Sequence, residues 1–172
     1  MTATSGQVES PGKVLVIALG NEDRGDDAVG AVIAEELCGR LPADVRVIAR
    51  RADVLCLIDD WAGIDALVCV DAAAPLGSPG RIHRINLHAG ALPIEISLTS
   101  SHAFGLAETI ELARALRLAP REIIIYAVEG GSFECGAALT PAVATAARVT
   151  ADRIVAEVAR LRYASPEGMP DA

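Results

Sequence analysis

The sequence predicts an α/β fold: a three-layer α/β/α sandwich around a twisted, mostly parallel sheet of about five strands. Short runs that are apolar throughout, rather than alternating, are typical of strands buried on both faces. These runs alternate with longer segments of helical periodicity, as helices covering both faces of a parallel sheet require. The 172 residues, 52% of them hydrophobic, suit a single domain with a full core. We expect this domain over 13–162, with flexible segments over 1–12 and 163–172.

The first half of the chain contains three apolar strand segments and one long helix. Residues 13–19 predict a buried parallel strand, and residues 26–40 predict a helix whose start Asp26 or Asp27 can cap. The apolar face of this helix is predicted to comprise Val29, Val32, Ile33 and Leu37. The elements that follow are predicted as a strand at 45–49, a short helix at 53–61 and a strand at 66–71.

The second half continues the alternation after a loop rich in proline and glycine. Two further strands are predicted at 81–87 and 94–99, and a central strand at 122–128. A helix is predicted at 102–117, with an inner face of Leu106, Ile110, Ala113 and Leu116. The last helix is predicted at 141–162, because Thr140-Pro141 places a capping residue before a proline in the first turn.

The composition excludes several classes of function. The formal net charge of -8 disfavours binding to nucleic acid or to anionic membranes. No apolar run approaches the roughly 20 residues that span a bilayer, and the first residues do not resemble a signal peptide, so we expect a cytoplasmic protein. The four cysteines are too dispersed for a zinc site. Cys69 is predicted in the core, and Cys135 as a nucleophile is a minor alternative.

A glycine-rich acidic loop over 20–30 directly follows the first predicted strand. A strand that opens through glycines into a helix commonly prepares a phosphate site at the helix N-terminus. This loop instead contains carboxylates, which repel phosphate and attract cations; they are Glu22, Asp23, Asp26 and Asp27. The chain also lacks the glycine patterns of dinucleotide and P-loop sites. The loop therefore favours a metal or a carboxylate mechanism over a nucleotide.

Two further polar residues are predicted at strand ends near this loop. Asp71 ends an apolar strand, where a carboxylate needs a partner or a metal, although it could also cap the next turn. His102 is predicted at a helix N-terminus, where the macrodipole favours the neutral imidazole that binds metals; the alternative is a surface histidine. Asp27 could serve only as a helix cap. Together, Asp27, Asp71 and His102 predict a divalent-metal site that suits nickel or zinc better than magnesium.

Four segments of the sequence resemble the hydrogenase maturation endopeptidases, in the order found in that family. They read VLVIALGNEDRGDDAVG, LVCVDA, SHAFGL and GAALTPAV, and the resemblance extends from about Lys13 to Leu161. It implies an endopeptidase that removes the C-terminal extension from the nickel-loaded precursor of a nickel-iron hydrogenase large subunit. A non-catalytic maturation chaperone of the same fold, which binds metal or precursor, is the alternative.

The resemblance also implies roles for individual residues. The metal-binding triad of the family falls on Asp27, Asp71 and His102, and Asp27 or Asp71 is expected to act as the catalytic base of an aspartic-type mechanism. The implied metal is nickel carried by the substrate, and zinc or cadmium is expected to fit the same site.

Substrate contacts are expected on both sides of the acidic loop. Gly20 and Asn21 match the family's frame around the triad. Arg50 and Arg51 occupy the place of a glycine-rich stretch thought to contact substrate in several members, and they could bind carboxylates of the precursor. The expected partner is thus the hydrogenase large-subunit precursor.

Overall fold

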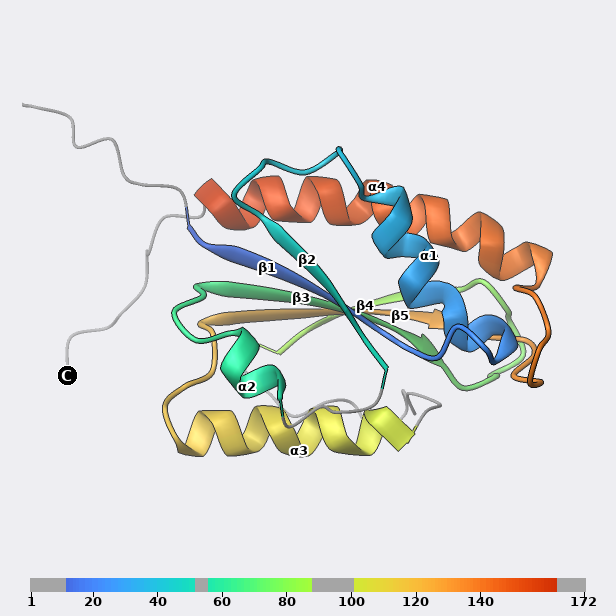
Figure 1. Ribbon diagram of the computed structural model, residues 1–172, viewed down its shortest axis with the longest axis horizontal. Helices are drawn as coiled ribbons and strands as arrows, with labels where there is room; N and C mark the ends of the chain where they lie inside the picture. Colours follow the sequence, from blue (N-terminus) through green and yellow to red (C-terminus); the bar gives the residue numbers. More distant parts are fainter. Residues whose placement is uncertain (1–11, 52–55, 88–100, 164–172) are drawn as a thin grey trace, which may run out of the picture.

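The protein folds as one sheet between two layers of helices (Figure 1). The computed structural model describes residues 12–51, 56–87 and 101–163, without the side chains of 101–105 and 107. The elements are β1 (Val14–Leu19), η1 (Gly25–Ala28), α1 (Val29–Glu36), β2 (Arg46–Arg50), α2 (Leu57–Asp60), β3 (Ala66–Ala73), β4 (Ile82–Asn86), α3 (Ser101–Ala115), β5 (Glu122–Glu129) and α4 (Pro141–Tyr163).

Within the described residues, the sheet has five strands in the order β2-β1-β3-β5-β4. The pairs among β2, β1, β3 and β5 are parallel, and β4 alone runs antiparallel, on the edge beside β5. The predicted fold class is therefore confirmed. The central strand predicted at 122–128 corresponds to β5, which lies inside the sheet between β3 and β4.

Alternate side chains of each strand enter two separate cores. Val68 and Val70 of β3 join a cluster that includes residues of α1 and α4. Leu67 and Cys69 join the cluster on the opposite face, beneath α2 and α3, and the predicted burial of Cys69 is confirmed. Because the period of a strand is two residues, Asp71 faces the same side of the sheet as Cys69.

The predicted helix over 26–40 is divided and shorter. Residues 25–28 form a 3₁₀ turn, η1, and the α-helix proper runs only from Val29 to Glu36. Gly39, at φ +71, lies in the turn that follows the helix. No side chain caps the start of η1 or α1, so the expected capping by Asp26 or Asp27 is wrong.

Other boundaries shift by a few residues. α3 ends at Ala115, so Leu116, expected on its inner face, lies beyond the helix and is 55% exposed. The short helix predicted at 53–61 is the single turn α2. The strand predicted at 94–99 lies outside the described residues. α4 begins at Pro141, as predicted.

One buried carboxylate joins α4 to the sheet. Glu157 accepts hydrogen bonds from Arg84 of β4 at 2.6 and 3.0 Å, from Arg160 at 2.7 Å and from the Tyr126 hydroxyl of β5 at 2.9 Å. Burial, the largest influence, raises the pKa of Glu157. The hydrogen bonds from Arg84, Arg160 and Tyr126 outweigh it and lower this pKa from 4.5 to about 2.

We expect this carboxylate to make the fold sensitive to acid. Since the folded-state pKa of Glu157 is depressed, its stabilisation is present above about pH 5 and is lost as the pH falls towards 2. The loss should amount to about 2–3 kcal/mol of unfolding free energy. Urea denaturation between pH 2 and 6 should show a weaker pH dependence for Glu157→Gln than for the native protein. Glu111→Gln, which removes an exposed ion pair with Arg114, should retain the native dependence.

Candidate active site

The candidate residues lie at the end of the sheet where the parallel strands finish. β1, β3 and β5 run in the same direction, so their carboxyl ends meet there. η1 follows β1 there, and α3 begins at the same end of the molecule (Figure 1). Ligand sites of open α/β sheets lie beyond the carboxyl ends of the strands, and the candidate residues therefore occupy the expected position.

Asp27 has a buried carboxylate that does not cap the helix it precedes. The residue lies in η1 and is 1% exposed, and its Oδ1 atom has no hydrogen-bond partner among the described residues. Withholding a hydrogen bond from a buried carboxylate oxygen is costly. Since Asp27 does not cap α1, the alternative of a simple helix cap is excluded. The free oxygen is suited to a cation or to the proton of a bound water.

Asp26 has the opposite environment. Its Oδ2 accepts the backbone N–H groups of Gly131 at 2.7 Å and Ser132 at 3.0 Å, together with the Thr140 hydroxyl at 3.0 Å. Its Oδ1 accepts the Thr140 N–H at 2.7 Å, and its own N–H donates to the Ser132 carbonyl at 2.8 Å. Asp26 therefore fixes η1 against the loop before α4, and it positions the neighbouring Asp27.

Asp71 is fully buried near the end of β3. Its Oδ1 accepts the N–H of Ala72 at 2.8 Å, and the strand continues to Ala73, so Asp71 does not cap a turn. η1 lies close to β3, which brings the segments of Asp27 and Asp71 together. Burial, followed by the charge of Asp71, raises the pKa of the Cys69 thiol far above its usual range. Cys69 is therefore a core thiol and not a nucleophile.

His102 is the second residue of α3, and its side chain is not among those described. Within the described side chains, no three His, Cys, Asp or Glu residues are grouped so as to hold a metal ion. The backbone places His102 at the N-terminal end of α3, on the face of the sheet that Asp71 occupies. The predicted triad is thus supported by the topology and stays a prediction.

Gly20 and Asn21 shape the acidic loop. Gly20 has φ +136, and a Cβ added there would lie 2.0 Å from the carbonyl oxygen of Asp27. Only glycine therefore allows the chain to pass this close to η1. The Oδ1 atom of Asn21 accepts the Asp23 N–H at 3.0 Å and a hydrogen bond from Arg51 at 3.3 Å. Both residues have a structural role here, and their contact with substrate stays a prediction.

The two arginines lie at the end of β2, beside this loop. Arg50 makes a bidentate ion pair with Asp60 at 3.0 and 2.8 Å, and hydrogen bonding to Asp60 raises the pKa of Arg50. Arg51 pairs with Asp23 at 2.6 Å, with both side chains largely exposed. Exposed ion pairs are weak, so Arg51 can exchange Asp23 for a substrate carboxylate more readily than Arg50 can leave Asp60.

Glu129 is a buried carboxylate that the sequence analysis missed. It ends β5, is 1% exposed, and its Oε1 accepts the N–H groups of Leu76 and Ser78, each at 2.6 Å. Its Oε2 has no hydrogen-bond partner within the described part of the chain. Glu129 follows an apolar strand, as Asp71 does, and this shared pattern could have identified it.

The contact between β1 and α1 leads to a test at Gly30. A Cβ added to Gly30 would lie 2.1 Å from the carbonyl oxygen of Leu19. Gly30→Ala should therefore cost more than about 2 kcal/mol of unfolding free energy, although alanine is the better helix former. A Cβ added to Gly39 would have no atom within 4 Å, and only the φ of +71 is unfavourable for alanine. Gly39→Ala should therefore cost about 1 kcal/mol of unfolding free energy. Equal costs in urea denaturation would contradict this account.

Comparison with protein families gives a match over most of the chain. The family model described as "Hydrogenase maturation protease" matches residues 32–157, a range that includes Asp71 and His102. No curated protein sequence matches the chain.

Solved structures of similar fold come from bacteria and archaea. The hydrogenase-maturating endopeptidase HybD from E. coli is 25% identical, with 86% of this chain and 93% of that chain covered and a TM-score of 0.74. The [NiFe] hydrogenase maturation protease HybD from Thermococcus kodakarensis is 26% identical, with 86% and 99% covered and a TM-score of 0.69. The similarity extends over nearly the full length of both proteins.

Proposed function

Because the chain belongs to the hydrogenase maturation protease family, we propose that it removes the C-terminal extension from the precursor of a nickel-iron hydrogenase large subunit. Family membership makes the chain a protease of hydrogenase maturation. The proposal adds that its substrate is the nickel-loaded precursor and that carboxylates of the chain perform the cleavage.

The observation that carries the proposal is the unpaired oxygen of Asp27. A buried carboxylate oxygen without a hydrogen-bond partner is unfavourable for stability. Both oxygens of the neighbouring Asp26 accept hydrogen bonds, so the loop is able to pair a carboxylate, yet the Asp27 Oδ1 atom has no partner among the described residues. This contrast supports a role for Asp27 in binding or chemistry rather than in folding.

In the proposed mechanism, Asp27, Asp71 and His102 recognise the nickel that the precursor carries. Imidazole together with carboxylates suits nickel, and zinc or cadmium fits the same donor set. The nickel belongs to the substrate, so the triad would select precursor that is already loaded with metal. This selection would place the scissile peptide beside the two carboxylates.

Asp27 or Asp71 would then act as the general base of an aspartic-type cleavage. The carboxylate takes a proton from a water whose oxygen adds to the scissile carbonyl carbon. The carbon–nitrogen bond breaks, and the proton passes to the leaving amine. The products are the mature C-terminus and the released extension.

The proposed setting is the cytoplasm. None of the described helices is both long and apolar enough to cross a membrane. The net charge of -8 supports a protein partner over nucleic acid or an anionic membrane surface.

The test is the intact mass of a co-expressed large-subunit precursor, with nickel supplied and withheld. We expect the mass to fall by that of a C-terminal peptide only when nickel is present. Stable binding of the precursor with an unchanged mass would contradict the protease proposal and favour a maturation chaperone. Cleavage without nickel would contradict recognition of the metal.

A further inference from the structure

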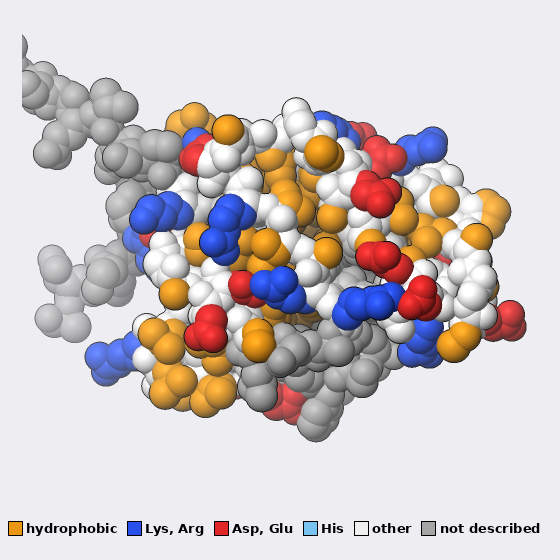
Figure 2. All heavy atoms as spheres, viewed as in Figure 1, with side chains coloured by type: hydrophobic (Ala, Val, Ile, Leu, Met, Phe, Trp, Pro, Cys, Tyr) orange, Lys and Arg blue, Asp and Glu red, His pale blue; other side chains and the backbone are white. Residues whose placement is uncertain are grey.

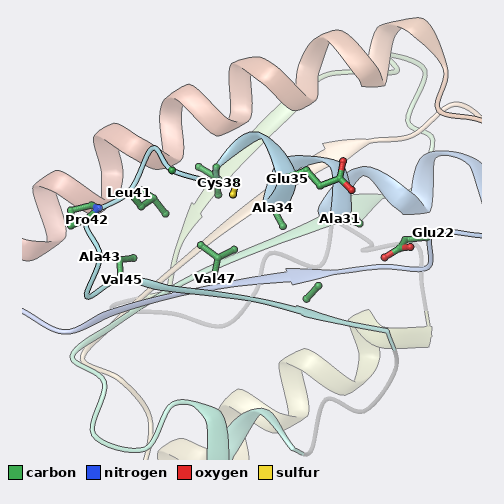
Figure 3. A pocket seen from close by; sticks show the side chains of 13 residues that line it. Glu22, Ala31, Ala34, Glu35, Cys38, Leu41, Pro42, Ala43, Val45 and Val47 are labelled. Carbon is green, nitrogen blue, oxygen red and sulfur yellow. The ribbon is translucent and has the colours of Figure 1, made fainter.

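A groove of about 830 Å³ lies between α1 and β2, away from the candidate catalytic residues (Figure 3). It lies on the face of the sheet that α1 covers, where α1 packs against β1, β2 and β3, and β2 is the outermost of the described strands on that side. The side chains of Val45, Val47 and Ala49 point to the same face of the sheet and form its floor. α1 and the turn that follows it form the opposite wall.

The groove is apolar along its length and acidic at one end. Ala34, Leu41 and Val47 line its middle. Glu22 and Glu35 flank the end nearest the acidic loop, and both are exposed (Figure 3). Neither carboxylate has an ion-pair or hydrogen-bond partner among the described residues. Figure 2 shows apolar side chains collected in the centre of this face, with charged side chains around them.

The position of β2 offers a second kind of contact. Among the described strands, β2 pairs only with β1. No described strand pairs with its outer edge, whose backbone groups are suited to an extended chain, as in recognition by strand addition. The five residues of β2 can match a segment of about five residues in length.

We propose that this groove binds an extended segment of the protease substrate, apolar in its middle and bearing a lysine or arginine that meets Glu22 and Glu35. The inference rests on the proposed function and assigns part of its substrate recognition. Two observations favour this occupant over a second copy of the chain. Glu22 and Glu35, which have no partner among the described residues, attract a cationic side chain, whereas the net charge of -8 disfavours a second copy of this chain. Glu22 also belongs to the loop that holds Asp27, so the acidic end of the groove adjoins one segment of the candidate active site.

The experiment measures cleavage of the nickel-loaded precursor by two groove variants. The double variant Glu22→Gln/Glu35→Gln removes the acidic end, and Ala34→Lys blocks the apolar wall. Each should raise KM for the precursor about tenfold and leave kcat within twofold, since the catalytic carboxylates are untouched. Added salt should raise KM for the native protein more than for the double variant. Glu108→Gln/Glu111→Gln removes two exposed carboxylates from α3, on the other face, and should retain the native KM.

Binding of the same precursor, measured separately from cleavage, distinguishes the failure of this inference from the failure of the proposed function. Cleavage by both groove variants with native KM would overturn the proposed role of the groove and leave the proposed function standing. If the native protein binds the precursor without cleaving it, the protease proposal fails, and tenfold weaker binding by the variants would still support the groove. If the native protein neither binds nor cleaves the precursor, both proposals are overturned.

Discussion

Replacing Asp27 with asparagine is expected to reduce the rate of precursor processing by at least about 100-fold while the protein stays folded. The amide cannot accept the proton that a general base removes, and loss of such a base costs about 10²- to 10⁴-fold. The Asp27 Oδ1 atom has no hydrogen-bond partner in the described structure, so the fold loses little when the charge is removed. We therefore expect activity to fall with the midpoint of thermal unfolding unchanged or raised.

The measurement combines the intact-mass assay of processing with thermal denaturation of the same preparations. Asp71→Asn and His102→Ala are expected to lose processing as well, because both belong to the proposed triad. Arg117→Gln provides a control, since this residue lies in the turn after α3 and should process at the native rate. If Asp27→Asn combined with His102→Ala still cleaved the precursor at the native rate, the assignment of the triad would be wrong.

Asp26→Ala is expected to have the opposite profile, with a large loss of stability. The substitution leaves the partly buried N–H groups of Gly131, Ser132 and Thr140 without their buried acceptor. Hydrogen bonds to a charged group contribute about 1.5–3 kcal/mol each, and the contributions overlap within one cluster. We expect a loss of about 3–5 kcal/mol of unfolding free energy, which corresponds to a midpoint lower by roughly 10 °C.

Urea and thermal denaturation provide this measurement, and two variants sharpen it. Asp23→Ala removes an exposed carboxylate from the same loop and should change the unfolding free energy by less than about 0.5 kcal/mol. Asp26→Asn retains the shape of the side chain, but its amide N–H group would face the N–H donors of the loop before α4. This variant should therefore not have the native unfolding free energy. A native unfolding free energy in Asp26→Ala would show that the loop before α4 is held by other contacts.

The strands and the general place of the site could be predicted because their signals are local. A strand buried on both faces requires a continuous apolar run, and β1 and β3 each have one. Parallel strands then bring their carboxyl ends to one edge, which is why Asp71 could be placed beside the loop of Asp27. The start of α4 could be predicted in the same way, because Thr140-Pro141 is a local signal for the first turn of a helix.

The different roles of the two adjacent aspartates could not be read from the sequence. Both were expected to be possible caps, yet Asp26 binds residues more than 100 positions away. No local pattern encodes such a contact, because it depends on where the loop after β5 lies in space. The groove could not be read from the sequence for the same reason, since it depends on how α1 and β2 lie in space.

The hydrogen bonds of Asp26 also bear on when a newly made chain becomes competent. Asp26 and Thr140 are 114 positions apart, so their hydrogen bonds cannot form before the chain has been made as far as Thr140. The loop that holds Asp27 therefore lacks these bonds until nearly the whole domain has been synthesised. A partly folded chain would lack an ordered pair of carboxylates, so cleavage would be delayed until the domain is complete.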